Sequence, residues 1–369
     1  MTRKDVAAVG GGEAQFLLAA STTPDVVEEW AALAARAVER NPFAEPAFAL
    51  PALRHLGGDR AGLLLVRRDG VAVGALPLIR GRRWRRLPIP VTAGWRHEHC
   101  YLGTPLLDAD DPGAAAGLLL DAMVRRSGRP GAAVFEWVLA DGPACRALEA
   151  AARARGTSPL WWDRFERAAL VRADTPVTSR SDHRHRRLRR KARALERDLG
   201  AVAVHDRAGD ESAVPAFLDL EASSWKGRES TALASSPATA AFFRAMCAAT
   251  RDAGALELLA LEAGPTTLAL ACNLVAGDDV FHFKSAFDEG AARYSPGALL
   301  MLDVRDRFDA ATTALRDSCA DPGAPLFEEL WPDRLAVGTL VVPSGPAARA
   351  VLAPLAASRR HLRSDDHSS

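Results

Sequence analysis

Apolar and polar positions alternate most clearly between Val280 and Phe287. Phenylalanines occupy one side of this pattern, whereas His282 and Lys284 occupy the other. A period of two residues is typical of a strand with one buried face. The stretch therefore predicts a half-buried strand that presents His282 and Lys284 on its second face.

A helix is predicted soon after this strand. Ser295 suits the N-cap and Pro296 the first helical position, and an apolar stripe follows as far as Val304. We expect the backbone N–H groups of residues 297–299 to be unpaired at this helix start. With the positive end of the helix dipole they would form an anion site into which a phosphate fits.

Two predicted hairpins lie 194 residues apart along the chain. The first turns at Asp69 and Gly70, a pair that favours the positive dihedral angles of a tight turn. The second turns at residues 263–265, again between apolar strands. Further helices are predicted at 24–39, 112–126, 142–155, 184–197, 213–225 and 237–251, and further strands at 132–138 and 168–171.

The order of these elements predicts an α/β (α+β) protein of two lobes. The polar segment 174–182 follows neither the period of a strand nor that of a helix, and it marks the boundary between the two lobes. We expect each lobe to be a mixed, mainly antiparallel sheet flanked by helices. The expected parts are a loose leader at 1–20, an N-terminal lobe at 21–175, a C-terminal lobe at 183–355 and a flexible tail at 356–369.

Composition narrows the class of protein. The 369 residues are 48% apolar and 25% charged, the balance of a soluble globular protein, and the net charge of +1 provides no global field for nucleic acid or an anionic membrane. The five cysteines are scattered without a C-x-x-C pair, which favours a reducing compartment. No apolar run reaches the roughly 18 residues of a membrane span. Residues 10–13 interrupt the apolar core of any signal peptide. We therefore expect a cytoplasmic protein.

Lysine is rare among the cations. Only Lys4, Lys191, Lys226 and Lys284 occur among 47 lysine and arginine residues. An ammonium differs from a guanidinium in geometry and in how readily it loses a proton. We therefore expect the retained lysines to need an ammonium, Lys284 in the predicted strand above all.

Residues of the strand, loop and helix also resemble a known family. Lys284, Asp288 and the run 293–297, Arg-Tyr-Ser-Pro-Gly, look like the core motif of GNAT-type acyltransferases in the CelD-like branch, which is associated with cellulose biosynthesis. The segments 317–322 and 330–334 look like a C-terminal signature of the same group. The two lobes then resemble tandem GNAT-like lobes, an arrangement that Fem-type peptidyl transferases also have.

The resemblance implies acyl-CoA, carrying an acetyl or longer chain, as the co-substrate and no metal. In GNAT proteins the backbone amides of such a loop hold the pyrophosphate of acyl-CoA at a helix start. Only the C-terminal lobe carries this loop. The residues expected to bind the cofactor are Arg293, Tyr294, Ser295, Gly297, Ala298 and Leu299.

Four residues are candidates for catalysis: His282, Lys284, Asp288 and Asp317. His282 titrates nearest neutrality and is a candidate base, with a satisfied histidine of the sheet as the alternative. Lys284 and Asp288 either contact the substrate or form an ion pair that fixes the loop. Asp317 lies at the strand after the motif helix, where the resemblance places the acyl group.

The candidate substrate-binding residues come from two segments. Glu221, Trp225 and Lys226 are expected on one helix that ends at Gly227, with Glu221 and Trp225 one turn apart on the same face. The resemblance places this segment beside the acceptor cleft. Cys319 and Asp321 follow Asp317, and a nucleophilic role for Cys319 is disfavoured because the sequence shows no base beside it.

Two further segments are rich in charged residues or in residue types that commonly bind metals. Residues 184–197 hold eight cations in 14 residues together with an apolar helical stripe, so this helix should pack on the protein. Its outer face is either simply solvated or a binding surface for the 3′-phosphate of CoA, for an acidic carrier protein or for RNA. The run 97–100, His-Glu-His-Cys, is too short and isolated to indicate a metal site.

The sequence thus predicts an N-acyltransferase that moves an acyl group from acyl-CoA, or an acyl carrier protein, to a primary amine of a small molecule, sugar or peptide. Nucleic acid is an unexpected partner. A Fem-like transferase that uses aminoacyl-tRNA is the rival enzyme, and the arginine-rich helix is its local hint. A non-catalytic binding protein of a polysaccharide system is the third reading.

Overall fold

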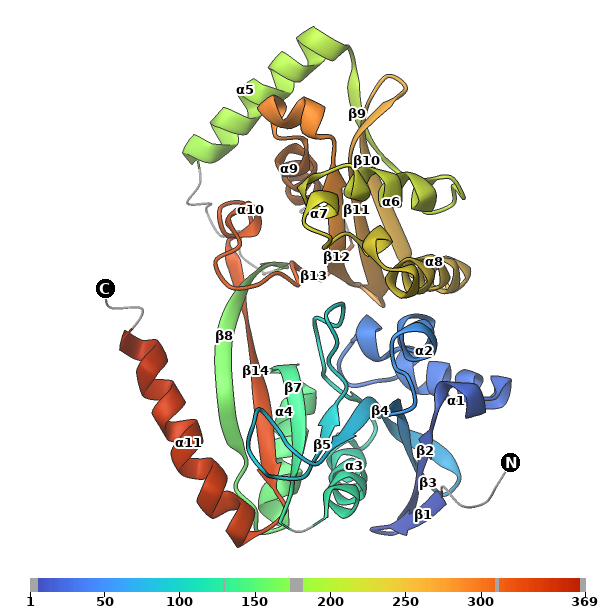
Figure 1. Cartoon of the computed structure of the whole chain (residues 1–369), viewed down its shortest axis with the longest axis vertical. Helices are drawn as coiled ribbons and strands as arrows, with labels where there is room; N and C mark the ends of the chain where they lie inside the picture. Colours follow the sequence, from blue (N-terminus) through green and yellow to red (C-terminus); the bar gives the residue numbers. More distant parts are fainter. Residues whose placement is uncertain (1–5, 129, 173–181, 309–311, 366–369) are drawn as a thin grey trace. The chain divides into compact units, whose positions relative to one another are not determined.

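A computed structural model describes residues 6–128, 130–172, 182–308 and 312–365 (Figure 1). The chain divides into two compact units. Unit 1 consists of Met1–Phe165 and Ala336–Ser369, and unit 2 consists of Glu166–Leu335. We describe each unit by itself.

Unit 1 is built on a mixed, mainly antiparallel sheet. Its strand order is β1-β2-β3-β4-β5-β7-β14-β8, β6 pairs with β4, and β5 and β7 run parallel. The chain crosses the boundary between the units within β8 and β14. The strands are β1 (Val6–Val9), β2 (Gly12–Leu17), β3 (Ala61–Arg68), β4 (Val71–Gly81), β5 (Val91–Gly94), β6 (Leu106–Leu107), β7 (Ala132–Leu139), β8 (Leu160–Val171) and β14 (Asp333–Pro343).

Helices cover both faces of this sheet, and β3 shows why. Leu63 and Leu65 join the core under α1 and α2, whereas Leu64 and Val66 join the core under α3 and α4. Alternate residues of a strand point to opposite faces, so a run that is apolar at every position is buried on both sides. The helices are α1 (Pro24–Ala35), α2 (Pro46–His55), α3 (Pro112–Ser127), α4 (Pro143–Ala154) and α11 (Pro346–Asp365).

Unit 2 repeats the plan with fewer strands. Its order is β8-β13-β12-β11-β10-β9, and β12 and β13 run parallel while the remaining pairings that we describe are antiparallel. The fold class predicted from the sequence, a mixed sheet flanked by helices, is confirmed. The further strands are β9 (Val202–Asp206), β10 (Leu256–Ala263), β11 (Thr266–Ala276), β12 (Asp279–Phe287) and β13 (Leu315–Asp317).

The helices of unit 2 lie on both sides of its sheet (Figure 1). Helices α5 and α9 share a core with β11, whereas Phe243 of α8 stacks on Phe283 of β12, with ring centroids 6.1 Å apart. Phe217 of α6 packs on Phe243 at 5.0 Å. The helices are α5 (Asp182–Leu199), α6 (Ala213–Ala222), α7 (Trp225–Arg228), α8 (Pro237–Asp252), α9 (Pro296–Phe308) and α10 (Pro325–Glu328), with 3-10 turns η2 (Ala19–Ser21), η3 (Pro42–Ala44), η4 (Leu233–Ser235) and η5 (Glu289–Tyr294).

Both predicted hairpins are present. At the turn between β3 and β4, Asp69 and Gly70 have φ angles of 52° and 80°, the two positive values that the tight turn requires. Between β10 and β11, Gly264 has a φ of 56° and Ala263 pairs with Thr266. Each turn is therefore encoded locally.

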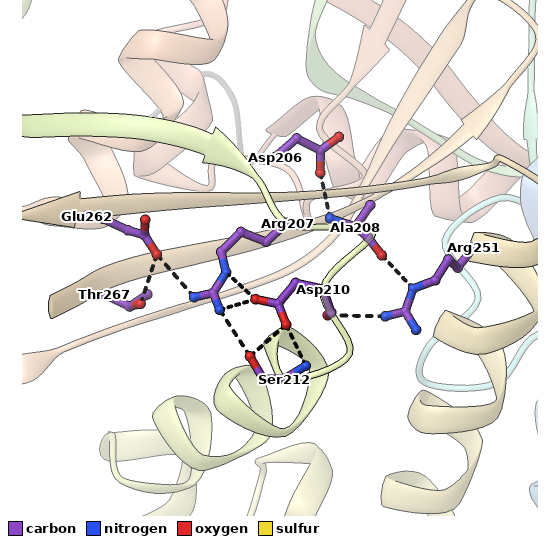
Figure 2. Close-up of polar contacts among 8 residues, drawn as sticks. All are labelled: Asp206, Arg207, Ala208, Asp210, Ser212, Arg251, Glu262 and Thr267. Atoms are coloured by element: carbon purple, nitrogen blue, oxygen red, sulfur yellow. Dashed lines mark hydrogen bonds and ion pairs between the residues drawn. The ribbon is translucent and has the colours of Figure 1, made fainter. Parts of the chain in front are cut away.

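A polar cluster fixes the loop from β9 to α6 (Figure 2). Arg207 donates to Asp210 in the loop and, at 3.1 Å, to Glu262 on β10. Arg251 on α8 donates to the carbonyl oxygens of Ala208 and Asp210. The cluster holds the chain that enters α6, and the last turn of α6 carries Glu221.

Several expected boundaries differ from the structure. The expected loose leader at 1–20 contains β1 and β2, which pair with each other, and β2 also pairs with β3, because their apolar residues complete the core of unit 1. Residues 336–355, expected in the C-terminal lobe, belong to unit 1, because β14 pairs with β7 there. The expected tail at 356–369 continues α11 as far as Asp365. The predicted boundary 174–182 lies almost wholly outside the described residues.

The predicted helix 213–225 is interrupted. It ends at Ala222, and Ser224 begins the short helix α7 by accepting a hydrogen bond from the Lys226 N–H. Gly227 makes this tight turn possible, because a Cβ there would lie only 1.8 Å from the Ala222 carbonyl oxygen. Glu221 and Trp225 therefore belong to different helices and share no face.

An ion pair between Arg167 and Asp317 links β8 to β13. Both side chains are fully buried, with 0% exposure, and Asp317 also accepts a hydrogen bond from the Cys319 N–H at 2.9 Å. Two charges without solvent are tolerated only because each satisfies the other. The sequence nominated Asp317 for catalysis, but a side chain with no exposed surface cannot contact substrate. The structure gives it a structural role.

We predict that Arg167→Met lowers the free energy of unfolding by about 3–5 kcal/mol, because it leaves Asp317 charged and buried without a partner. Adding Asp317→Asn should restore much of the loss, since the amide carries no charge and still accepts from Cys319. Urea denaturation of the single and double variants measures both effects. Equal destabilisation by the single and double variants would show that the buried charge is not the cause.

Candidate active site

The start of α9 is formed differently from the prediction. Ser295 precedes the helix as expected, but its backbone is left-handed, with φ 58° and ψ 57°. Its carbonyl oxygen accepts from the N–H groups of Ala298 and Leu299, both at 3.0 Å. The prediction that these two amides are unpaired is wrong, because Leu299 makes the first i→i−4 hydrogen bond of the helix and Ala298 makes a tighter i→i−3 bond to the same carbonyl oxygen.

A lysine lies at this helix start instead. The Lys191 ammonium on α5 donates to the Ser295 hydroxyl at 2.7 Å. Gly297 is partly exposed, and a Cβ built on it would meet only Phe287, at 3.8 Å. The site thus combines a fixed cation, the positive end of a 13-residue helix and a backbone without a side chain.

Helix α5 also ties down the two residues before Ser295. The Tyr294 hydroxyl donates to Asp198 at 2.6 Å. The Arg293 guanidinium lies 3.5 Å from the same carboxylate and 4.5 Å from the centre of the Tyr294 ring. Arg293, Tyr294 and Ser295 were predicted as cofactor ligands, and the structure brings them together through Lys191 and Asp198. Sequence reasoning missed both partners, although the rarity of lysine had singled out Lys191.

A second group gathers around Glu221, which is fully buried at 0% exposure. One of its carboxylate oxygens accepts from the Lys226 ammonium at 3.2 Å and lies 3.8 Å from the Lys284 ammonium. The other oxygen accepts from the Leu233 N–H at 2.8 Å. Two of the four lysines of the chain therefore converge on one buried carboxylate.

Trp225 lies outside this group. The residue is 43% exposed, and its backbone N–H donates to the Glu289 carboxylate at 2.8 Å. Arg228 pairs with the same Glu289, so α7 is anchored to η5. Asp288 acts locally as well, because its carboxylate accepts from the Gly290 N–H at 2.8 Å and begins η5.

His282 ends a chain of buried polar contacts. Its Nδ1 lies 2.9 Å from the Asn273 side-chain oxygen, Asn273 donates to Glu257 at 2.7 Å, and Arg316 makes two hydrogen bonds to Glu257. Because the Asn273 amide nitrogen is used on Glu257, its oxygen must accept from His282. The proton of His282 is thus on Nδ1, and Nε2 carries the lone pair.

This environment makes His282 a weak base. The side chain is 8% exposed, and burial, with the nearby Lys226 and Arg316 charges, lowers its pKa from 6.5 to about 3. A general base is most effective when its pKa is close to the working pH. The alternative of a satisfied sheet histidine fits the observed contacts better than the role of base.

A β-bulge explains why His282 and Lys284 have different neighbours. Asn273 pairs with His282 and Cys272 with Lys284, so Phe283 is an extra residue in β12. A bulge breaks strict alternation and re-aims the side chains around it. His282 packs against the Phe327 ring at 5.1 Å, whereas Lys284 reaches Glu221. The simple alternation read from the sequence therefore does not hold here.

In the sheet of unit 2, the pairing between β12 and β13 stops beside these residues. β13 pairs with β12 only from Asp279 to Phe281. Beyond Phe281, none of the strands that we describe pairs with that edge of β12. Cys319 is buried after β13, with a φ of 49°, and Asp321 is exposed in the next loop. The arrangement can bind an anion at α9 and place two ammonium groups on β12 and α7.

A family model described as "Acetyltransferase (GNAT) domain" matches residues 182–315. No curated protein sequence matches the chain significantly. Among solved structures, FemX is 13% identical, with a TM-score of 0.56 over 85% of this chain and 95% of that chain. The C-terminal domain of a putative lysylphosphatidylglycerol synthetase from Agrobacterium fabrum is 15% identical, with a TM-score of 0.53 over 88% and 94%.

A tandem GNAT protein from the clavulanic acid biosynthesis pathway is also similar, with 15% identity and a TM-score of 0.43 over 91% of this chain and 99% of that chain. Residues 182–315 are thus similar to a GNAT acetyltransferase domain, and the fold of the chain is similar to the folds of FemX and of the synthetase domain. In the described ranges, no helix is both long and apolar enough to cross a bilayer. The same residues contain no group of three or more His, Cys, Asp or Glu side chains arranged to hold a metal.

We predict that the His282 imidazole stays neutral from pH 8 down to about pH 4. The unfolded chain takes up a proton near pH 6.5 and the folded one only near 3, so the stability held above pH 6.5 falls as the pH drops between these values. NMR titration, with His282→Gln to assign the signal, measures the pKa directly. A pKa of 6 or more would restore His282 as a candidate base.

Proposed function

We propose that unit 2 transfers an acyl group from a CoA thioester to a primary amine. The observation that carries this proposal is the Lys191 ammonium at 2.7 Å from Ser295, where α9 begins. The match of residues 182–315 to an acetyltransferase domain supports the same reaction class. The CelD-like branch and the nature of the acceptor belong to the proposal, with a small molecule, a sugar or a peptide as candidates and an acyl carrier protein as an alternative donor.

The pyrophosphate of CoA would lie at the start of α9. Lys191 supplies a full positive charge, and the helix adds its partial positive end. Gly297 lets a phosphate approach the backbone, because no side chain shields its N–H group. This site differs from the one that the sequence predicted, since it uses one lysine and one amide where three amides were expected.

The arm of CoA carries amide groups that can pair with an open strand edge. The edge of β12 beyond Phe281 offers backbone donors and acceptors, as an exposed strand does when it binds an extended peptide. One acceptor on β12, the Ser285 carbonyl oxygen, is held by Lys226 at 2.8 Å. The thioester would then lie near Lys226 and Lys284.

The ammonium groups would stabilise the transition state. The amine nitrogen attacks the thioester carbon, the C–N bond forms, the C–S bond breaks, and CoA leaves as a thiolate that takes up a proton. Negative charge gathers on the carbonyl oxygen during attack, and a fixed cation lowers the energy of that state. Lys284 is suited to this role because its ammonium group lies 3.8 Å from Glu221, which holds it in place, and its side chain is 15% exposed. With His282 a weak base, water takes the proton of the amine.

A second candidate donor is aminoacyl-tRNA, and α5 favours it. Arg186, Arg190, Arg193 and Arg197 are exposed and recur at helical spacing, so they form one stripe along the helix. Such a stripe attracts a phosphate backbone. The likeness to FemX shows a shared fold and does not decide the donor.

We predict that Gly297→Asp weakens CoA binding at least about tenfold, because it adds a negative charge where the pyrophosphate lies. Calorimetry measures the affinity. Gly113→Asp is the matched control, because Gly113 also follows a proline at the start of a helix, α3, and its Cβ position is equally open.

Lys191→Met should weaken CoA binding as well. Thermal melting with CoA or with tRNA separates the two donors, because only a ligand of the native state raises the melting temperature. Unchanged CoA affinity in folded Gly297→Asp, or stabilisation by tRNA alone, rules out the CoA site.

We predict that Lys284→Arg loses activity nearly as badly as Lys284→Met, by about one to two decades in rate. Arginine keeps the charge, but its longer forked head cannot take the place of the ammonium. Both variants should melt close to the wild type, because Lys226 still pairs with Glu221. Full turnover by Lys284→Arg would show that any cation suffices.

A further inference from the structure

A run of arginines lies where β4 ends in unit 1, and we call residues 80–86 the arginine loop. Five of these seven residues are arginines, and all five are exposed. Arg85 pairs with Asp163 at 3.2 Å. Within the described ranges, the other four form no ion pair: Arg80, Arg82, Arg83 and Arg86. Because the net charge of the whole chain is only +1, the loop is a local concentration of positive charge.

The tip of the arginine loop is a strained turn. Trp84 and Leu87 exchange two backbone hydrogen bonds, at 3.0 and 2.8 Å, across Arg85 and Arg86. These two arginines have φ angles of 46° and 70°, values that a tight turn requires but that favour Gly, Asn or Asp. The turn after β3 meets the same demand with an Asp-Gly pair. The turn alone therefore does not explain the two arginines.

Trp84 anchors the arginine loop to the sheet. Its side chain is buried, its ring lies 4.6 Å from that of Trp162 on β8, and its indole N–H donates to Glu136 on β7 at 3.1 Å. The aromatic residue of the loop thus points inward while the arginines remain in solvent. This anchor fixes where the exposed charges lie on unit 1.

The arginine loop and α11 cover the same face of the sheet. Trp84 and Leu352 of α11 belong to one core together with Val341 of β14. The neighbours of Val341 on that strand, Leu340 and Val342, join the core under α3 and α4. Alternate residues of a strand point to opposite faces, so the loop and α11 lie opposite α3 and α4.

The outer side of α11 is apolar as well as its inner side. Apart from Ser358, the exposed residues between 346 and 358 are all apolar: Pro346, Ala347, Ala350, Val351, Pro354 and Leu355. The single charged residue of this stretch, Arg349, donates to the Ser158 carbonyl oxygen at 2.7 Å. A helix that is apolar all round is normally buried. The part of the chain that the structure describes leaves this side of α11 uncovered, with Val351 49% exposed.

We propose that the arginine loop and the outer side of α11 form one docking face for the surface of a bilayer that contains anionic lipids. The forked guanidinium groups pair with lipid phosphates. Val351 and Leu355 enter the boundary between headgroups and acyl chains, as the apolar side of an interfacial helix does. Charge and apolar surface thus act together, as stable binding to a bilayer surface requires.

Other partners fit only one half of this docking face. A nucleic acid would use the arginines but would gain nothing from an apolar helix. A second copy of the chain could cover α11, but a symmetric interface presents the same surface on both subunits. It would therefore bring two arginine loops together, and their charges would repel.

Flotation of the full chain with lipid vesicles tests this inference. Vesicles of phosphatidylcholine with about 30% phosphatidylglycerol should bind the protein at about 0.1 M salt at least tenfold more tightly than vesicles of phosphatidylcholine alone. Raising the salt to about 0.5 M should release most of the protein, because it screens the arginines from the lipid phosphates.

Two double variants separate the halves of the docking face. Arg82→Gln with Arg83→Gln should weaken binding to the anionic vesicles at least about tenfold. Val351→Ser with Leu355→Ser should weaken it by about tenfold as well, and both residues are exposed, so the fold is retained. The matched control is Arg146→Gln with Arg153→Gln, which removes two exposed charges from α4 on the opposite face and should bind as the wild type does.

Arg86→Gly distinguishes binding from support of the fold. Glycine adopts a φ of 70° without strain, so this variant should melt at a higher temperature than the wild type, yet it should bind the anionic vesicles about fivefold more weakly. Equal binding to neutral and anionic vesicles, equal losses in the α4 control, or unchanged binding in either docking-face double variant overturns the proposal. So does binding of duplex RNA, or a dimer in sedimentation, without binding to the anionic vesicles.

Discussion

Much of unit 2 depends on one buried carboxylate. Glu221 lies in the last turn of α6, and its contacts reach Lys226 on α7, the backbone of Leu233 at η4 and Lys284 on β12. A charge without solvent is costly unless nearly every lone pair is used, so these elements must close around it in one arrangement. The interruption between α6 and α7 follows from this demand, because a continuous helix would carry Lys226 around its axis and away from Glu221.

Lys284 and His282 of β12 lie in opposite electrostatic surroundings, and Lys226 of α7 shares those of Lys284. Glu221 pairs with the Lys226 and Lys284 ammonium groups, whereas burial and nearby cations lower the pKa of His282 and keep its ring neutral. The bulge at Phe283 lies between His282 and Lys284 and places these two residues in the different surroundings. Strand β12 thereby presents one fixed cation, Lys284, next to a neutral, hydrogen-bonded ring, His282. That separation favours electrostatic stabilisation over proton transfer as the contribution of β12 to the proposed acyl transfer.

The start of α9 and the polar cluster of Figure 2 show how distant segments determine local contacts. Lys191 and Asp198 come from α5, about a hundred residues before the loop that they organise. Arg207 and Arg251 fix the entry to α6 in the same way. The helices of unit 2 are thus more than covers of a sheet. Their polar ends place the charges on which the proposed chemistry depends.

The sequence by itself determined the elements whose cause is local. The Asp69-Gly70 turn needs two positive φ angles, and a long apolar stripe requires a helix wherever it lies. The resemblance of the second unit to a GNAT domain could also be recognised from short motifs, because the strand, loop and helix around Ser295 are contiguous in the sequence. The lysines could be singled out because they are rare in a chain that otherwise uses arginine.

Only the tertiary structure decided which side chains meet. The break after Ala222 depends on the contact of Glu221 with β12, and the bulge at Phe283 depends on the register with β11. Asp317 was nominated as a catalyst but is neutralised by Arg167, 150 residues away in the chain. Register, burial and ion pairing depend on residues far apart in sequence, so no local pattern could reveal them.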